Sequence, residues 1–172
     1  NKILNGITDW VYEEEFAVTN LMAWSPDSEY LTYVRFDESE VPEYSMQMWG
    51  NGLYPGYYNF KYPKAGENNS KVTVHSYSVA TKDIKELKVP VEGDYYIPRI
   101  TFTTNSDQLA VMTLNRQQNV FNMYYVNPKS GVSRLILRDE NKCYVDSEWL
   151  TSIHFNPSGF TYVSEQDGYS HI

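Results

Sequence analysis

Cysteine, long apolar runs and positive charge are all scarce in this sequence. A single cysteine, Cys143, among 172 residues excludes an internal disulfide. No apolar run approaches the ~20 residues that a membrane-spanning helix needs, so we expect no membrane span in this segment. The 14 lysines and arginines are outnumbered by 22 aspartates and glutamates, which gives a net charge of −8. Because nucleic-acid-binding domains carry basic faces, this balance argues against a nucleic-acid partner.

The sequence also lacks the short motifs that mark common catalytic and metal-binding sites. It has no Gly-x-Ser-x-Gly nucleophile motif. It has no Cys and His spacing typical of zinc and no acidic calcium loop. Its histidines, His75, His154 and His171, lie in separate segments, so we assign them structural or surface roles. We therefore expect no catalytic residue, no metal site and no cofactor in this chain.

Aromatic residues, by contrast, are abundant, with 16 tyrosines, 7 phenylalanines and 4 tryptophans. Such residues favour β-strands, and they recur here in a pattern of strand, polar turn and strand. The turns read SPDS at 25–28, TNSD at 104–107 and NPSG at 156–159. Pro presets the backbone of such turns, and Asp, Asn or Gly completes them. The pattern predicts a series of antiparallel hairpins.

A second type of hairpin, at 72–87 and 121–137, follows the first two of these turns. Together the two types make a four-stranded unit, and the next unit starts about 53 residues after the second. A period near 50 with four strands per repeat predicts the blades of a β-propeller. A single β-sandwich of similar strand count is the alternative.

We therefore expect an all-β fold of about three four-stranded antiparallel blades, forming a partial propeller domain over residues 1–172. The blade-like units are roughly 21–90, 99–139 and a truncated 151–172. The only helix that we expect is a short turn at 12–16. The predicted strands lie near 21–24, 30–37, 71–79, 84–89, 99–103, 109–115, 121–126, 132–138, 151–155 and 160–165.

An insertion separates the second and third strands of the first unit. About 33 residues lie between Asp37 and Lys71, where a plain blade needs only a short link. This arm, residues 41–66, carries many aromatic side chains, among them Tyr44, Trp49, Tyr54, Tyr57, Tyr58 and Phe60. The arm either folds back on its own blade or offers a surface to a partner, since aromatics and Met are enriched in interface cores.

Three consecutive carboxylates, Glu13, Glu14 and Glu15, stand between aromatic residues in the stretch DWVYEEEF at 9–16. One interpretation is a solvated helix start, where acidic residues favour the positive end of the helix dipole. The other is a clamp for a cation. The free amino terminus of a peptide is such a cation, with three donors and no acceptor, and two converging carboxylates satisfy it better than one.

The order of residues in this stretch resembles the double-glutamate segment of the dipeptidyl peptidase IV family of serine exopeptidases. The resemblance rests on NGITDWVYEEE at 5–15 and continues through WSPD at 24–27, FD at 36–37, VP at 41–42, YPKAG at 62–66 and DGYSHI at 167–172. It spans nearly the whole chain, densest over 5–80 and thin over 85–150.

The resemblance implies that the segment lies in an amino-terminal β-propeller and that Glu14 and Glu15 grip the amino terminus of the substrate. Trp10, Tyr12 and Phe16 would support them, and Glu13 would be scaffold. The arm would help to build a homodimer. The catalytic Ser, Asp and His would belong to an α/β-hydrolase domain downstream of this chain.

We accordingly expect a substrate-gating piece of a secreted or periplasmic enzyme that releases X-Pro or X-Ala dipeptides from peptide amino termini. The abrupt start at Asn1 suggests an excised piece, which alone would be inactive and would self-associate through exposed blade faces or the arm. The alternatives are a related tripeptidyl peptidase, a propeller used only for protein binding, and a structural repeat protein with a coincidental acidic turn.

Overall fold

The computed structural model describes residues 2–172 and consists mainly of antiparallel strands. The first sheet contains β1 (Ile3–Asn5), β2 (Met22–Trp24), β3 (Tyr30–Asp37), β6 (Lys71–Ser78) and β7 (Ile84–Leu87). Its order is β1-β3-β6-β7, and β2 also pairs with β3. The predicted strands at 21–24, 30–37, 71–79 and 84–89 thus lie in one sheet, as expected.

Two short strands share one edge of β3 in this sheet. β1 pairs with residues 35–37 of β3, and β2 pairs with residues 31–33. At the junction, the Gly6 N–H donates to the Val34 carbonyl at 2.9 Å, and the Val34 N–H donates to the Leu21 carbonyl at 2.9 Å. Residues 7–20 therefore leave the sheet and return to it at adjacent positions, which sets the helix α1 (Trp10–Phe16) on the rim. The sequence patterns did not predict β1.

The second sheet is a four-stranded meander. Its strands are β8 (Tyr95–Phe102), β9 (Leu109–Asn115), β10 (Val120–Val126) and β11 (Ser133–Glu140), in the order β11-β10-β9-β8. The prediction that both hairpins of 99–138 share one sheet is confirmed. Residues 109–114 of β9 are all buried, because the strand lies between elements packed on both of its faces, which explains its nearly continuous apolar sequence.

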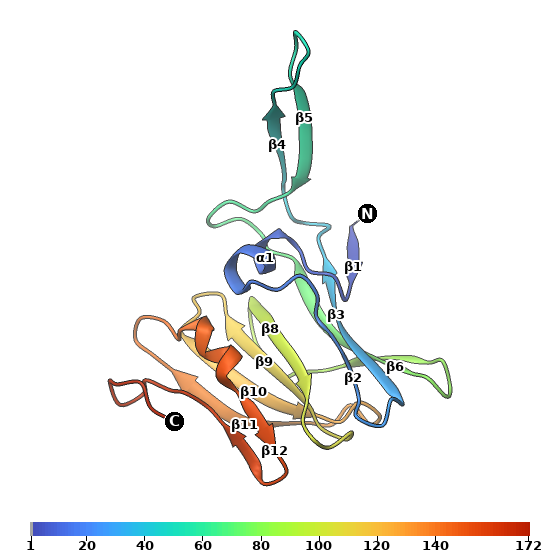
Figure 1. Cartoon of the computed structure of the whole chain (residues 1–172), viewed down its shortest axis with the longest axis vertical. Coiled ribbons are helices and arrows are strands. Elements are labelled where there is room, and N and C mark those ends of the chain that lie inside the picture. Colours follow the sequence, from blue (N-terminus) through green and yellow to red (C-terminus); the bar gives the residue numbers. More distant parts are fainter. Residues whose placement is uncertain (1) are drawn as a thin grey trace.

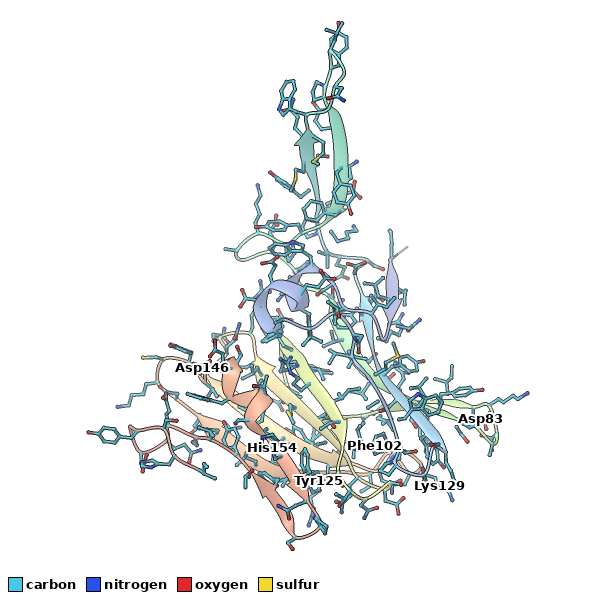
Figure 2. All side chains as sticks on the ribbon, viewed as in Figure 1. Asp83, Phe102, Tyr125, Lys129, Asp146 and His154 are labelled. Atoms are coloured by element: carbon cyan, nitrogen blue, oxygen red, sulfur yellow. The ribbon has the colours of Figure 1, made fainter. Side chains whose placement is uncertain are left out.

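The carboxyl-terminal part begins with a 3₁₀ helix, η1 (Ser147–Ser152), and continues with the hairpin β12 (His154–Asn156) and β13 (Gly159–Thr161). The expectation of a single helical turn was wrong here. Asp146 caps η1 by accepting a 2.9 Å hydrogen bond from the Glu148 N–H, and Leu150 is buried beneath it. The predicted strand at 151–155 therefore starts only at His154, which Figure 2 labels beside Tyr125 of the second sheet.

The three parts pack around one continuous apolar core. It includes Phe36 and Val74 of the first sheet, Leu114 and Met123 of the second, and Leu150 of η1. Outside the core, the start of β7 meets the turn after β10, where Lys85 Nζ donates to the Lys129 carbonyl at 2.8 Å. Figure 2 labels Asp83 and Lys129 at this corner. The prediction of an all-β fold of antiparallel sheets is confirmed, although the first sheet has five strands instead of the four expected.

The arm is a β-hairpin that stands away from both sheets (Figure 1). Its strands, β4 (Glu43–Met48) and β5 (Gly56–Lys61), pair only with each other. Near the tip, Leu53 is 94% exposed and Tyr54 is 87% exposed. The arm is therefore a hairpin with regular cross-strand pairing and does not fold back on its blade.

Candidate functional site

Helix α1 starts where the buried Asp9 caps it. Asp9 Oδ1 accepts a 3.1 Å hydrogen bond from the Tyr12 N–H, and Asp9 Oδ2 accepts one of 2.5 Å from the Ser70 hydroxyl. Burial raises the pKa of Asp9 above its ordinary value, although these two hydrogen bonds act in the opposite direction. The cap explains why the helix begins at Trp10 and not at Tyr12 as predicted.

One face of α1 is fixed by buried aromatic side chains. Tyr12 is 2% exposed and Phe16 is 4% exposed. The Tyr12 ring meets Phe16 and Phe36 edge-on, with centroids 5.3 and 4.7 Å away, a geometry that aromatic quadrupoles favour. On the arm side, Trp10 packs on Tyr62, with ring centroids 4.3 Å apart. The three aromatic residues expected to support the glutamates thus lie against the body of the protein.

A bulge in β8 gives α1 its contact with the second sheet. The register of β8 shifts between Tyr96 and Arg99, so Ile97 has no partner in the strand ladder. The Ile97 N–H donates instead to the Tyr12 hydroxyl at 2.7 Å. Burial raises the pKa of the Tyr12 phenol well above its usual value, so this hydroxyl remains protonated.

The carboxyl end of α1 is held by a half-buried cation, Arg99, and by a left-handed residue. Arg99 Nη2 donates to the Phe16 carbonyl at 2.8 Å, and burial lowers the pKa of Arg99 below its usual value. Ala17 adopts a left-handed backbone with φ 50° directly after the helix, a conformation that ends helices. The segment is therefore an α-helix from Trp10 to Phe16, longer than the short turn expected at 12–16.

The three glutamates are exposed on this anchored helix and point to different surroundings. Glu13 lines a groove of about 660 Å³ between α1 and the arm. Glu15 faces the second sheet, where its Oε2 accepts a 3.3 Å hydrogen bond from Gln118 Nε2. Among the interactions within residues 2–172, no side-chain hydrogen bond or ion pair involves Glu14. Successive helical side chains diverge by about 100°, so only the reach of the side chains can bring two of these carboxylates together.

The groove beside Glu13 is acidic and partly apolar. Asp9, Glu38 and Glu43 line it with Glu13, and Met46 and Phe60 of the arm form its apolar wall. Burial raises the pKa of Glu38, and the charge of Asp9 raises it further. Glu13 lines this groove, whereas Glu15 does not and instead contacts Gln118.

The histidines do not form a catalytic constellation. His75 stacks on Tyr33 with centroids 5.5 Å apart, and His171 lies 3.4 Å from Asp167 on the surface. Within the described range 2–172, no group of three or more His, Cys, Asp or Glu side chains is placed to hold a metal ion. No helix in that range is long and apolar enough to cross a membrane.

Several residues that shape the site were not predicted from the sequence. Ser70, Arg99 and Gln118 contact α1 from positions 61 to 103 residues away. No local motif marks them. Ser70 lies directly before β6 of the first sheet, whereas Arg99 and Gln118 belong to the second sheet. The packing of both sheets around α1 brings them together, so a residue pattern within 9–16 could not reveal them.

Comparison with known proteins gives consistent matches. The family model described as the dipeptidyl peptidase IV (DPP IV) N-terminal region matches residues 1–172. Dipeptidyl peptidase 4 of Trichophyton rubrum is 32% identical over 185 residues, covering 99% of this chain and 24% of the relative. Prolyl endopeptidase FAP of Mus musculus is 37% identical over 127 residues, covering 70% of this chain and 17% of the relative.

A solved structure extends the likeness to three dimensions. The crystal structure of Porphyromonas gingivalis dipeptidyl peptidase 4 matches with a TM-score of 0.95 and 60% identity, covering 99% of this chain and 24% of that chain. The present chain thus spans about a quarter or less of the length of these relatives. Since the family model matches every residue and the fold agrees, this chain belongs to the dipeptidyl peptidase IV family, as part of its amino-terminal β-propeller region.

Proposed function

We propose that this chain is the amino-terminus-recognising segment of a serine-type dipeptidyl peptidase, with Glu14 and Glu15 holding the substrate ammonium. The observation that carries the proposal is the anchoring of α1. Its buried face is fixed by Tyr12 and Phe16, and its carboxyl end by Arg99. The two glutamates are exposed at that end, so a rigid helix offers both charges to a ligand.

The chemistry of an ammonium matches such a pair. It has three N–H donors and no acceptor, so a single carboxylate leaves part of it unsatisfied. Two carboxylates from one helix accept more of these donors and cancel the positive charge where water is excluded. By holding the ammonium at a fixed place, the two glutamates would set the distance from the amino terminus of the substrate to the bond that is cleaved.

Glu13 has a different role in this proposal. It faces the groove between α1 and the arm with Asp9 and Glu38, whereas Glu15 faces Gln118. The placement supports Glu13 as scaffold and Glu14 and Glu15 as the recognition pair.

The remaining parts of the proposal rest on the family. The catalytic Ser, Asp and His would lie in a carboxy-terminal α/β-hydrolase domain of the parent protein, so residues 1–172 alone would be inactive. The products would be X-Pro or X-Ala dipeptides, and the enzyme would be periplasmic or secreted. The exposed arm, with Trp49 at 73% and Tyr57 at 68% exposure, would contribute to a homodimer.

Steady-state kinetics of the full-length enzyme tests the proposal. Removing one member of a desolvated charge pair costs about 2–5 kcal/mol, and each 1.4 kcal/mol is tenfold. Glu14→Gln and Glu15→Gln should therefore lower kcat/KM roughly 30-fold or more. Glu13→Gln is the matched control and should change it only slightly, because exposed charges contribute about 0–1 kcal/mol.

A modified substrate tests the same point from the other side. Acetylating the substrate amine removes the charge, so the loss should be at least as large as that of either variant. Rates should also fall above pH ~8, where a free α-amine loses its proton. Variants of Glu14 and Glu15 that cleave free and acetylated peptides as well as the parent does would refute the clamp.

A further inference from the structure

The turn between β9 and β10 holds Gln118 in an unusual conformation. Gln118 has φ 54°, in the left-handed region, which is uncommon for residues other than glycine. Glycine would adopt this backbone with less strain. A long polar side chain at such a strained position points to a role for the contacts that the Gln118 side chain makes.

The turn is braced so that Gln118 is held in place. The Gln118 N–H donates to the Asn115 carbonyl at 2.8 Å, and the Gln118 carbonyl accepts from the Val145 N–H at 2.7 Å. The Asn115 side chain ties the far side of the turn, since its Oδ1 accepts from the N–H groups of Asn119 and Val120, both at 3.0 Å. The backbone at Gln118 is therefore fixed from both sides of the turn.

The side chain of Gln118 reaches across to α1. Its Nε2 donates to Glu15 Oε2 at 3.3 Å, over 103 residues of sequence. Its neighbour Gln117 is exposed and reaches only Asn115, at 3.2 Å. The contact is also asymmetric, because within residues 2–172 it involves Glu15 and not Glu14. One carboxylate of the pair is thus tethered to the second sheet while the other is not.

From this geometry we infer that Gln118 is a positioning residue for substrate recognition. It holds the Glu15 carboxylate in the orientation that receives the ammonium, and it does so through a neutral donor that adds no competing cation. The inference rests on the proposed role of Glu15. Gln118 acts through Glu15 and does not itself touch the reacting atoms, so its effect should fall on substrate binding more than on the chemical step.

The test is a kinetic comparison in the full-length enzyme. Gln118→Gly removes the side chain and suits the left-handed backbone, so folding should be preserved and the thermal midpoint should not fall. A hydrogen bond to a charged group contributes more than a neutral one. We expect kcat/KM for a free-amine dipeptide substrate to fall about 5- to 10-fold, mostly through KM, as for an interaction made equally in the ground and transition states.

Two further variants report on the mechanism. Gln118→Asn also tolerates the left-handed backbone, but its side chain is one methylene shorter, so it should behave like Gln118→Gly. The matched control is Gln117→Ala, which removes an adjacent amide without touching Glu15 and should leave kcat/KM unchanged.

A double-mutant cycle separates this inference from the proposed function. In a Glu15→Gln background the effect of Gln118→Gly should disappear, whereas in a Glu14→Gln background it should persist. If Glu15→Gln impairs the enzyme but Gln118→Gly does not, or if the Gln118→Gly effect survives in the Glu15→Gln background, the inference is wrong and the clamp stands. If Glu15→Gln itself has no effect, the proposed function is wrong, and the inference about Gln118 is overturned with it.

Discussion

The hydroxyl of Tyr12 offers the sharpest test of how α1 is held. Tyr12→Phe keeps the ring that packs against Phe16 and Phe36, and removes only the oxygen that accepts the Ile97 N–H at 2.7 Å. Both residues are buried, Tyr12 at 2% and Ile97 at 0% exposure. Water therefore cannot replace the lost acceptor without opening the packing.

The expected magnitude follows from that burial. A buried donor that loses its partner costs about 1–3 kcal/mol, and the ring packing that is retained should add little to this. We expect the free energy of unfolding to fall by about that amount. Because the β8 bulge leaves Ile97 without a ladder partner, its amide should also exchange with solvent faster, by about tenfold for each 1.4 kcal/mol.

Denaturant unfolding and hydrogen exchange measured by NMR or mass spectrometry would report both effects. Tyr54→Phe is the matched control, since Tyr54 is 87% exposed in the arm and should change neither quantity. Unchanged stability together with an unchanged exchange rate at Ile97 would refute the idea that this hydrogen bond anchors the helix.

Two other predictions concern charge and assembly. Since burial raises the pKa of Asp9 in the folded protein, its ionised form lowers stability above the ordinary carboxyl pKa near 4 and not below it. Asp9→Asn keeps an oxygen that can cap the helix, so its thermal midpoint relative to the parent should rise between pH 4 and pH 7; a constant difference would contradict this. The 172-residue chain should also self-associate through exposed apolar groups, with Leu53→Ser and Tyr54→Ser reducing its sedimentation coefficient at high concentration if the arm contributes. A monodisperse parent chain would count against self-association.

The sequence by itself determined most strands of the two large sheets and their hairpins, although not β1 or the strands of the arm. The turn residues at 25–28 and 104–107 are local signals, and so are the alternating or continuous apolar segments around them. Turn propensity and the burial of apolar side chains determine such elements within a few residues. The all-β class and the single sheet formed by 99–138 followed from these signals. The family also followed from the local order of residues in 5–15.

Two predicted element boundaries were wrong because helix caps in the sequence were not recognised. The cap at Asp9 moved the start of α1 to Trp10, and the cap at Asp146 produced η1 where a strand was expected. Capping aspartates were present in the sequence, but Asp is also common in turns, so composition alone did not distinguish the two. The two strands of the arm were not predicted, because they pair only with each other and β4 is exposed along its whole length, without the alternation of a half-buried strand.

Only the tertiary structure decided how the glutamates are presented. Their spacing alone allowed a solvated helix start as readily as a clamp. The bulge in β8 of the second sheet anchors α1 through Ile97 and Arg99. The turn between β9 and β10 of the same sheet places Gln118 against Glu15. These contacts join residues more than 80 positions apart, and no pattern within a short window encodes them. They form because the second sheet packs its apolar face against the buried side of α1 and thereby sets polar groups at the rim within hydrogen-bonding distance.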